Sequence, residues 1–227
     1  MQNIEKNLSH IHQQIEQAAI ACKRSADDVT LLAVSKRKPA SDIRSAYACG
    51  QRHFGENYLQ EAEQKINELA DLDICWHFIG AIQSNKTRLL AEDFDWVHCV
   101  DRLKIARRLS EQRAESKPPL NICIQVNVDG EESKAGIKLE DIEALAKQIA
   151  ELPNIRLRGL MTIPAPREGL ESQREPFARL RSALESLNQL GYDCDTLSMG
   201  MTHDMPAAIA EGATLVRIGT AIFGERS

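Results

Sequence analysis

The sequence lacks a long hydrophobic run and an excess of positive charge, and each absence excludes a class of protein. No segment approaches the roughly 18 apolar residues that span a bilayer, and the opening MQNIEKNLSHIHQQ lacks the apolar core of a secretory signal. The 227 residues carry 28 Lys and Arg against 33 Asp and Glu, whereas nucleic-acid binders normally present a basic surface. We therefore expect a cytoplasmic protein with neither a nucleic-acid nor a membrane partner.

The spacing of the cysteines also lacks any pattern typical of a disulfide framework or a metal site. The six cysteines form no CxxC pair, and their spacings are wide and irregular. This pattern predicts neither a disulfide framework nor a metal site with the paired spacing of a zinc cluster. Several lie inside apolar runs, where a free cysteine behaves as a small buried hydrophobe. We expect most of them to be structural.

The chain also lacks linkers, low-complexity tracts and charge blocks. Its Pro-rich points, at 117–119 and 163–166, resemble turns between elements. Because barrels often reach 200–250 residues as one unit, residues 1–227 are expected to form a single domain. That domain begins with a helix, since Ile4, Leu8, Ile11 and Ile15 fall on one helical stripe.

After this helix, short apolar runs alternate with helical segments. The expected strands cover 29–35, 52–55, 75–80, 96–100, 120–128, 157–163, 196–199 and 214–223, and the expected helices cover 40–49, 57–69, 84–91, 102–114, 139–152, 175–190 and 205–211. Such alternation indicates a parallel sheet, and eight units in this length indicate an α/β fold, a single-domain (β/α)8 TIM barrel. An open doubly wound sheet is the alternative, although no GxGxxG follows the first strand.

Lys36 stands where the site of such a barrel is expected, at the carboxyl end of a strand. It directly follows the apolar run LLAVS, and partial desolvation there would favour the neutral amine that Schiff-base chemistry requires. A solvated lysine beyond a strand end is the plainer alternative. Lys38, two residues further on, is expected to be solvated.

Two loops near the carboxyl end are candidates for an anion site. Residues 198–202, SMGMT, lead into a helix, and Gly219 with Thr220 follows the last strand. Barrels commonly bind phosphate in the loops after strands seven and eight. The alternative is two ordinary strand-to-helix turns.

Arg217 lies within the apolar run LVRI, where a buried guanidinium needs an acceptor or an anion. The alternative partner is a barrel carboxylate such as Glu56. A Schiff-base lysine, a phosphate cradle and a buried arginine together indicate pyridoxal 5′-phosphate (PLP) as the cofactor.

The same motifs resemble those of the pyridoxal phosphate homeostasis protein family (YggS/PROSC), nearly end to end. The resemblance lies in LLAVSKRKP, HFGENYLQE, WHFIGAIQSNK, VNVDGEESKAGI, LRGLMTIP, LSMGMTHD and VRIGTAIFGER. It implies a barrel like the N-terminal domain of alanine racemase. It also implies a set of cofactor-binding residues: Lys36 for the Schiff base, Asn57 beside the ring, Arg217 facing the ring nitrogen, and Ser198, Gly200, Gly219 and Thr220 for the phosphate, with backbone contacts from Met199 and Met201.

The resemblance further implies binding and delivery of PLP, with apo PLP-dependent enzymes as recipients and no established turnover. An arginine cannot be deprotonated, so it would keep the ring nitrogen unprotonated and weaken the cofactor as an electron sink. Racemisation needs two acid/base groups, and the chain ends at Ser227 without the second domain that supplies one in a racemase. We expect a monomeric carrier. The alternatives are a low-activity racemase or lyase with Lys36 as base, and a Schiff-base aldolase that binds a sugar phosphate.

Overall fold

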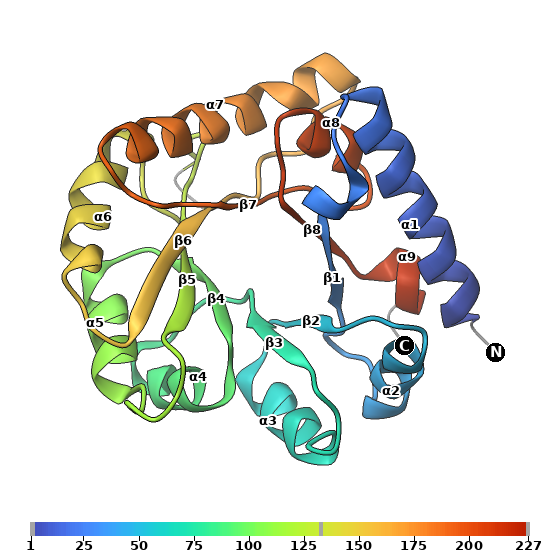
Figure 1. Cartoon of the computed structure of the whole chain (residues 1–227), viewed down its shortest axis with the longest axis horizontal. Coiled ribbons are helices and arrows are strands. Elements are labelled where there is room, and N and C mark those ends of the chain that lie inside the picture. Colours follow the sequence, from blue (N-terminus) through green and yellow to red (C-terminus); the bar gives the residue numbers. More distant parts are fainter. Residues whose placement is uncertain (1–2, 132–133, 226–227) are drawn as a thin grey trace.

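Eight parallel strands close into one barrel (Figure 1). The computed structural model describes residues 3–131 and 134–225. Each strand pairs with the next along the chain, and β8 returns to pair with β1. The predicted (β/α)8 barrel is confirmed, and the open doubly wound sheet is wrong. The strands are β1 (Thr30–Val34), β2 (His53–Glu56), β3 (Cys75–Phe78), β4 (Trp96–Val100), β5 (Leu120–Gln125), β6 (Ile155–Met161), β7 (Thr196–Ser198) and β8 (Leu215–Ile218).

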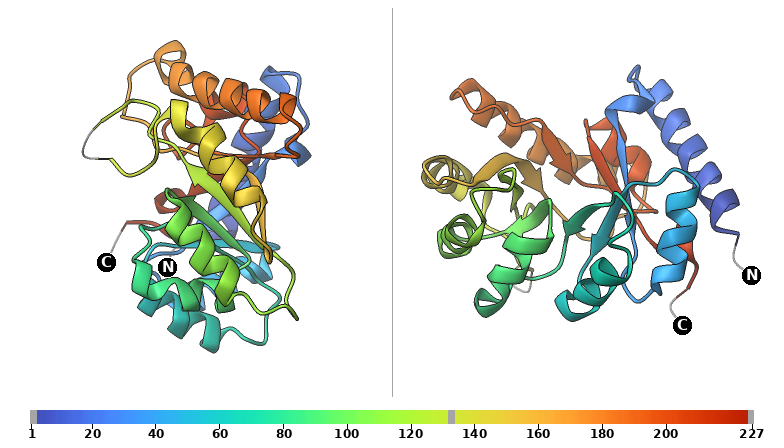
Figure 2. Two further views of the ribbon diagram at one scale, coloured as in Figure 1. Left: turned by 90° about the vertical axis from the view of Figure 1, so that its left-hand side faces the viewer. Right: turned by 60° about the horizontal axis from the view of Figure 1, so that its bottom comes forward.

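Helices surround the strands on the outside, as two further views show (Figure 2). They bury their apolar faces against the barrel, which places one continuous core between the helices and the strands. Among the described residues, no helix is long and apolar enough to cross a membrane. The helices are α1 (Ile4–Ala21), α2 (Ala40–Ala48), α3 (Leu59–Glu68), α4 (Thr87–Asp93), α5 (Leu103–Gln112), α6 (Ile142–Ala150), α7 (Leu170–Gln189), α8 (Met205–Ala210) and α9 (Thr220–Phe223), with short 3-10 turns at 26–28, 84–86 and 139–141.

The leading helix α1 packs against the outside of the barrel. Its predicted stripe of Ile4, Leu8, Ile11 and Ile15 is buried, as expected. Helix α1 lies beside α8 and α9 (Figure 1), and the Asn7 side chain donates to the Ile222 carbonyl at 2.9 Å. The helix therefore covers the part of the barrel where the last strand meets the first.

Several predicted boundaries differ from the structure by two or three residues, and two differ by five. The last strand was expected over 214–223, but β8 ends at Ile218, and Thr220–Phe223 forms the short helix α9 after Gly219. A short apolar run has no periodicity that separates strand from helix, and here Ile222 and Phe223 are buried in the core that α1 completes. Helix α7 begins at Leu170 rather than at residue 175, because its exposed first turn adds no apolar periodicity.

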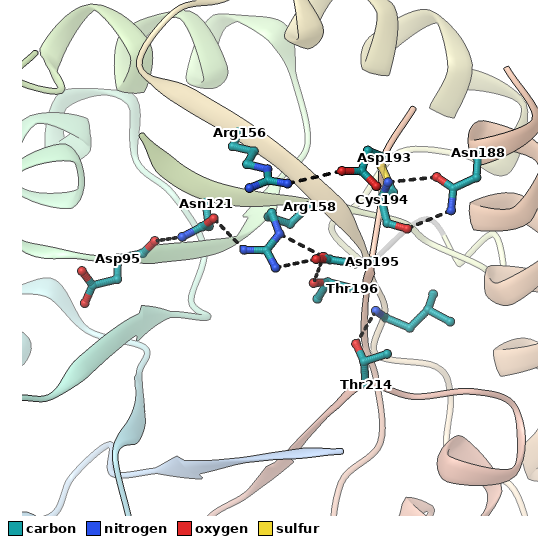
Figure 3. Close-up of polar contacts among 11 residues, drawn as sticks. Asp95, Asn121, Arg156, Arg158, Asn188, Asp193, Cys194, Asp195, Thr196 and Thr214 are labelled. Carbon is teal, nitrogen blue, oxygen red and sulfur yellow. Dashed lines mark hydrogen bonds and ion pairs between the residues drawn. The ribbon is translucent and has the colours of Figure 1, made fainter. Parts of the chain in front are cut away.

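A polar network lies at the amino-terminal end of the barrel (Figure 3). The Arg158 guanidinium donates to both carboxylate oxygens of Asp195, at 2.9 and 2.6 Å, and to the Asn121 side chain at 2.9 Å. It also lies over the Trp96 ring, with its central carbon 4.6 Å from the ring centre. Arg158 on β6 is therefore paired on both sides, and it connects β5 with the residue that precedes β7.

Candidate functional site

Lys36 lies at the carboxyl end of β1, at the mouth of the barrel. The strand ends at Val34, Ser35 is fully buried, and Lys36 is half-buried. A small pocket of about 30 Å³ is lined by Lys36 together with Gly219 and Thr220. The pairing of β1 with β8 accounts for this proximity, because it sets the ends of the two strands side by side. The structure therefore brings three of the predicted site residues together.

A buried ion pair supports the backbone just before Lys36. The Lys65 amine donates to Glu56 at 2.8 Å and to the Ser35 carbonyl at 2.8 Å, and the Ser35 hydroxyl donates to Glu56 at 2.6 Å. Burial raises the pKa of the Glu56 carboxyl, although the Lys65 charge and the hydrogen bonds from Lys65 and Ser35 oppose that rise. Ser35 is thus held through both its side chain and its carbonyl, which limits the movement of the residue that follows it.

Lys38 is not solvated, so that prediction is wrong. Its side chain is buried and its amine donates to the Glu225 carbonyl at 2.7 Å. The chain after α9 passes over this position and provides the acceptor. The sequence shows only which residues neighbour Lys38 along the chain. It therefore does not predict a contact with a residue 187 positions away.

Arg217 is buried, with 5% of its surface exposed, on β8. Its guanidinium donates to the Ser198 carbonyl at 2.6 Å, to the Ser198 hydroxyl at 2.9 Å and to the Thr162 carbonyl at 2.8 Å. The alternative ion pair with Glu56 is therefore wrong. Burial lowers the pKa of Arg217 to about 10, because its acceptors are neutral oxygens and the negative charge of Asp204 only partly offsets the desolvation. Arg217 stays positively charged at neutral pH.

A chain of three histidines continues from Ser198 through the barrel interior. The Ser198 hydroxyl lies 2.8 Å from His98 Nδ1, His98 Nε2 lies 2.9 Å from His77 Nδ1, and His77 Nε2 lies 2.9 Å from His53 Nδ1. Burial lowers the pKa of His98 to about 3, with the Arg217 charge as a second cause, and lowers that of His77 well below its usual range. Both imidazoles are therefore neutral at pH 7.

Strand β7 leads into a tight turn at Met199 and Gly200. Gly200 has a φ of +96°, and a Cβ at this position would lie 2.6 Å from the Cβ of Ala208 on α8. Only glycine allows both this backbone and this close packing. The Gly200 carbonyl accepts from the Arg217 amide at 2.9 Å, and Met199 is fully buried. The structure thus joins Ser198, Met199, Gly200 and Arg217 into one unit on strands β7 and β8.

Asn57 follows β2 and lines a different cavity from Lys36. This cavity, of about 470 Å³, also includes Tyr58, Phe78 and Gly80. Asn57 Oδ1 is buried and has no hydrogen-bond partner among the described residues. Gly80 packs directly against the Asn57 backbone, where any Cβ would collide with the Asn57 carbonyl. Asn57 is therefore rigidly placed, with an acceptor that a ligand could satisfy.

Several residues that organise the site were not predicted from the sequence: His98, Thr162, Lys65 and Lys38. Each of them acts through a partner in another part of the chain. One signal was present, since His53, His77 and His98 each interrupt an expected strand. A polar ring inside a short apolar run needs a hydrogen-bond partner when it is buried.

Comparison with known proteins places these features in a family. The profile described as "Alanine racemase, N-terminal domain" matches residues 2–227. The Pyridoxal phosphate homeostasis protein of Pseudomonas aeruginosa is 60% identical over 226 residues, which are 100% of this chain and 97% of that relative. The protein of the same name in Escherichia coli strain K12 is 52% identical over 229 residues, with 100% and 98% covered.

One solved structure is similar along its whole length. It is PipY of Synechococcus elongatus with PLP bound, at a TM-score of 0.85 and 39% identity, and the match covers 98% of this chain and 100% of PipY. The fold, the family profile and the full-length identity to named relatives agree. The chain therefore belongs to the alanine racemase N-terminal domain family, and within it to the pyridoxal phosphate homeostasis proteins.

Proposed function

We propose that this protein binds PLP through the Lys36 amine and serves PLP homeostasis as a carrier. The pocket that brings Lys36 together with Gly219 and Thr220 is the observation that carries the proposal. Support also comes from the names of the relatives and from PipY, whose structure holds PLP. When bound, the cofactor supplies an aldehyde that reacts with an amine and a phosphate that needs donors.

The residues around the pocket suit such a group by their chemistry, although the pocket itself, at about 30 Å³, encloses only a small part of it. Gly219 packs closely against Val34, because a Cβ there would lie 3.1 Å from the Val34 carbonyl oxygen. Thr220 offers an exposed hydroxyl. Asn57 Oδ1, buried without a partner among the described residues, offers an acceptor on the β2 side. We assign the phosphate to Gly219 and Thr220 together with the turn at Ser198, Met199 and Gly200.

Ser198 contributes to this turn mainly through Arg217. Its hydroxyl and carbonyl both accept from the guanidinium, so the side chain orients Arg217 as well as shaping the loop. Arg217 is a pure donor, and we propose that it meets the ring nitrogen of the cofactor. A donor that cannot lose its proton keeps that nitrogen unprotonated, which limits stabilisation of negative charge on a substrate.

This limit is the reason for proposing a carrier rather than an enzyme. Apo PLP-dependent enzymes are the expected recipients, and the protein is expected to act as a monomer in the cytoplasm. The alternative is a low-activity PLP-dependent racemase or lyase with Lys36 as base. Incubation of the loaded protein with single amino-acid enantiomers separates the two, since turnover on the order of 1 per second or faster contradicts the carrier.

Borohydride reduction followed by peptide mass spectrometry tests the binding itself. We expect reduction to fix the cofactor on Lys36 and on no other residue. The matched variants Lys36→Arg and Lys38→Arg each remove one amine that lines the same pocket while keeping a positive charge. The first should abolish the fixed adduct and the second should keep it. An adduct that survives in Lys36→Arg at the wild-type level contradicts the proposal, and it would also exclude a Schiff-base aldolase that uses Lys36.

A further inference from the structure

The end of the barrel opposite Lys36 holds a cluster of three side chains with metal-binding atoms. His53 begins β2, and Cys75 and His77 lie on β3 two residues apart, so they share one face of that strand. His53 Nδ1, Cys75 Sγ and His77 Nε2 all lie within 4.8 Å of one another. Strands β2 and β3 pair with His53 opposite Cys75. The cluster is therefore fixed by sheet register rather than by a loop.

The separations of these atoms are close to those of a tetrahedral zinc site. His53 Nδ1 lies 2.9 Å from His77 Nε2, and Cys75 Sγ lies 3.4 Å from His77 Nε2. Bonds of about 2.0–2.1 Å to nitrogen and about 2.3 Å to sulfur place tetrahedral ligand atoms about 3.3–3.6 Å apart. To admit an ion, the two imidazole nitrogens must separate by only a few tenths of an ångström, and Cys75 Sγ is already near the expected distance from His77 Nε2. Without the ion, the two imidazoles share one N–H hydrogen bond.

The orientation of His77 is already that of a ligand. Its Nδ1 lies 2.9 Å from His98 Nε2, and its ring is stacked on Trp96 with 5.5 Å between centres and 10° between planes. Metal-bound histidines commonly donate their other N–H to a buried partner, which fixes the ring. A cation on His77 Nε2 places the proton on Nδ1, where it points at His98. The hydrogen-bond partner that a metal-bound His77 needs at Nδ1 is therefore already in place.

Charge and access at this end of the barrel also favour a cation. Burial, with the nearby carboxylates of Asp95 and Asp73 as further causes, raises the pKa of the Cys75 thiol to about 12. The same Asp95 charge opposes the burial that lowers the pKa of His53. A cavity of about 420 Å³, lined by His53 and His77, provides an entry path and room for water. The nearby Arg158 cation is neutralised by Asp195.

We propose that His53 Nδ1, Cys75 Sγ and His77 Nε2 bind a thiophilic divalent cation of the Zn²⁺ class, with a water molecule from the cavity as the fourth ligand. On binding, the Cys75 S–H bond breaks, a metal–sulfur bond forms, and one proton leaves to solvent. The imidazoles bind through their lone pairs and keep one proton each. The step involves no oxidation or reduction. The cysteine spacing alone did not predict this site, because its ligands come from two strands.

A cobalt titration of the full chain, freed of metal by a chelator, tests the proposal. Co²⁺ bound to a thiolate in tetrahedral geometry gives a thiolate-to-metal charge-transfer band and strong visible bands. We expect saturation at one equivalent, displacement of the bands by Zn²⁺, and release of one proton per Zn²⁺ to a pH indicator. Failure of these signals in the wild-type protein overturns the proposal. PLP is not required for any of them, so the result is independent of the proposed function.

Matched variants locate the ion. Cys75→Ser should abolish the charge-transfer band, and His53→Asn should weaken binding by at least about 100-fold, because changes outside the ligand set alone cost about 10–100-fold. Cys49→Ser, at an exposed cysteine outside the cluster, should change neither. Bands that survive Cys75→Ser, or that disappear in Cys49→Ser, overturn the assignment. Protection of Cys75 from alkylation by Zn²⁺ in the wild-type protein gives the same answer if a variant fails to fold.

Discussion

The Ser198 hydroxyl lies 2.8 Å from His98 Nδ1, and the same oxygen accepts from Arg217 at 2.9 Å. Because a guanidinium can only donate, the hydroxyl accepts from Arg217, and the direction of its hydrogen bond with His98 follows the tautomer of that ring. Ser198 therefore connects the buried cation on β8 to the histidine chain that crosses the barrel. The predicted cofactor site and the proposed metal site lie at opposite ends of this connection.

Replacing Ser198 with alanine should lower the free energy of unfolding by about 1–3 kcal/mol, because a buried imidazole nitrogen loses its partner. Urea denaturation measures the change. Ser45→Ala is the control, since the exposed Ser45 hydroxyl bonds only to a carbonyl of its own helix, and this variant should stay within about 0.5 kcal/mol of wild type. Equal effects of the two substitutions would show that the buried connection contributes nothing.

Gly80→Ala should displace Asn57, because the new methyl group collides with the Asn57 carbonyl. Overpacking of this kind costs about 1–3 kcal/mol or more, and the affinity for PLP should fall with it if Asn57 lies beside the ring. Gly55→Ala is the matched control on the same side of the barrel. Its Cβ would meet only side-chain atoms of Leu32 and Ile79, at 3.2–3.3 Å, which can shift. Thermal unfolding and PLP titration of both variants measure the difference, and a larger loss in Gly55→Ala would refute the argument.

The barrel was predictable because its signals are local. Each strand is a short apolar run and each helix repeats its apolar residues along one face, so windows of 5–20 residues contain the information. The prediction failed where the apolar pattern of a strand and that of a helix look alike. The run after Gly219 is apolar enough for a strand, but it forms the helix α9, which packs against α1 at the other end of the chain.

The site was predictable only in its positions along the chain. Lys36 at the end of β1 and Gly219 after β8 follow from the rule that barrel sites gather at the carboxyl ends of strands. The partners of the charged residues do not follow from any such rule. Arg217 binds Ser198 and Thr162 rather than Glu56, and Lys65 binds Glu56 instead. The register of the strands decides which barrel residues come into contact. The pattern of one sequence does not specify that register.

Acid should selectively weaken the brace between Arg158 and Asp195 (Figure 3). Burial alone raises the pKa of Asp195, but hydrogen bonds from Arg158 and Thr196 outweigh it, and the net pKa lies below the usual value. Such a carboxylate stabilises the fold above its unfolded pKa of about 3.9, and the contribution disappears as pH falls through the lower folded value. The stability difference between wild type and Asp195→Asn should therefore be largest near neutral pH and shrink below about pH 4.

Asp193→Asn is the control for this pH profile. The Asp193 side chain is 96% exposed and meets Arg156 through one contact of 3.4 Å. Exposed ion pairs contribute about 0–1 kcal/mol, so this variant should resemble wild type at every pH. Urea unfolding across the pH range compares the three proteins. A constant difference between wild type and Asp195→Asn down to pH 3 would mean that the ion pair with Arg158 is not the source of the stabilisation.

Lys65→Met should be among the most destabilising single changes near the predicted cofactor site. It leaves the Glu56 carboxyl buried without its cation and removes the donor to the Ser35 carbonyl. Breaking a buried pair from one side costs about 3–5 kcal/mol, whereas removing both charges costs much less. The double variant Lys65→Met with Glu56→Gln should therefore recover part of the loss, and urea unfolding of the four proteins in this cycle measures the coupling. Arg44→Met, which breaks an exposed pair with Asp71, should cost at most about 1 kcal/mol. Simple additivity of the two substitutions would show that Lys65 and Glu56 stabilise the backbone before Lys36 independently rather than as a pair.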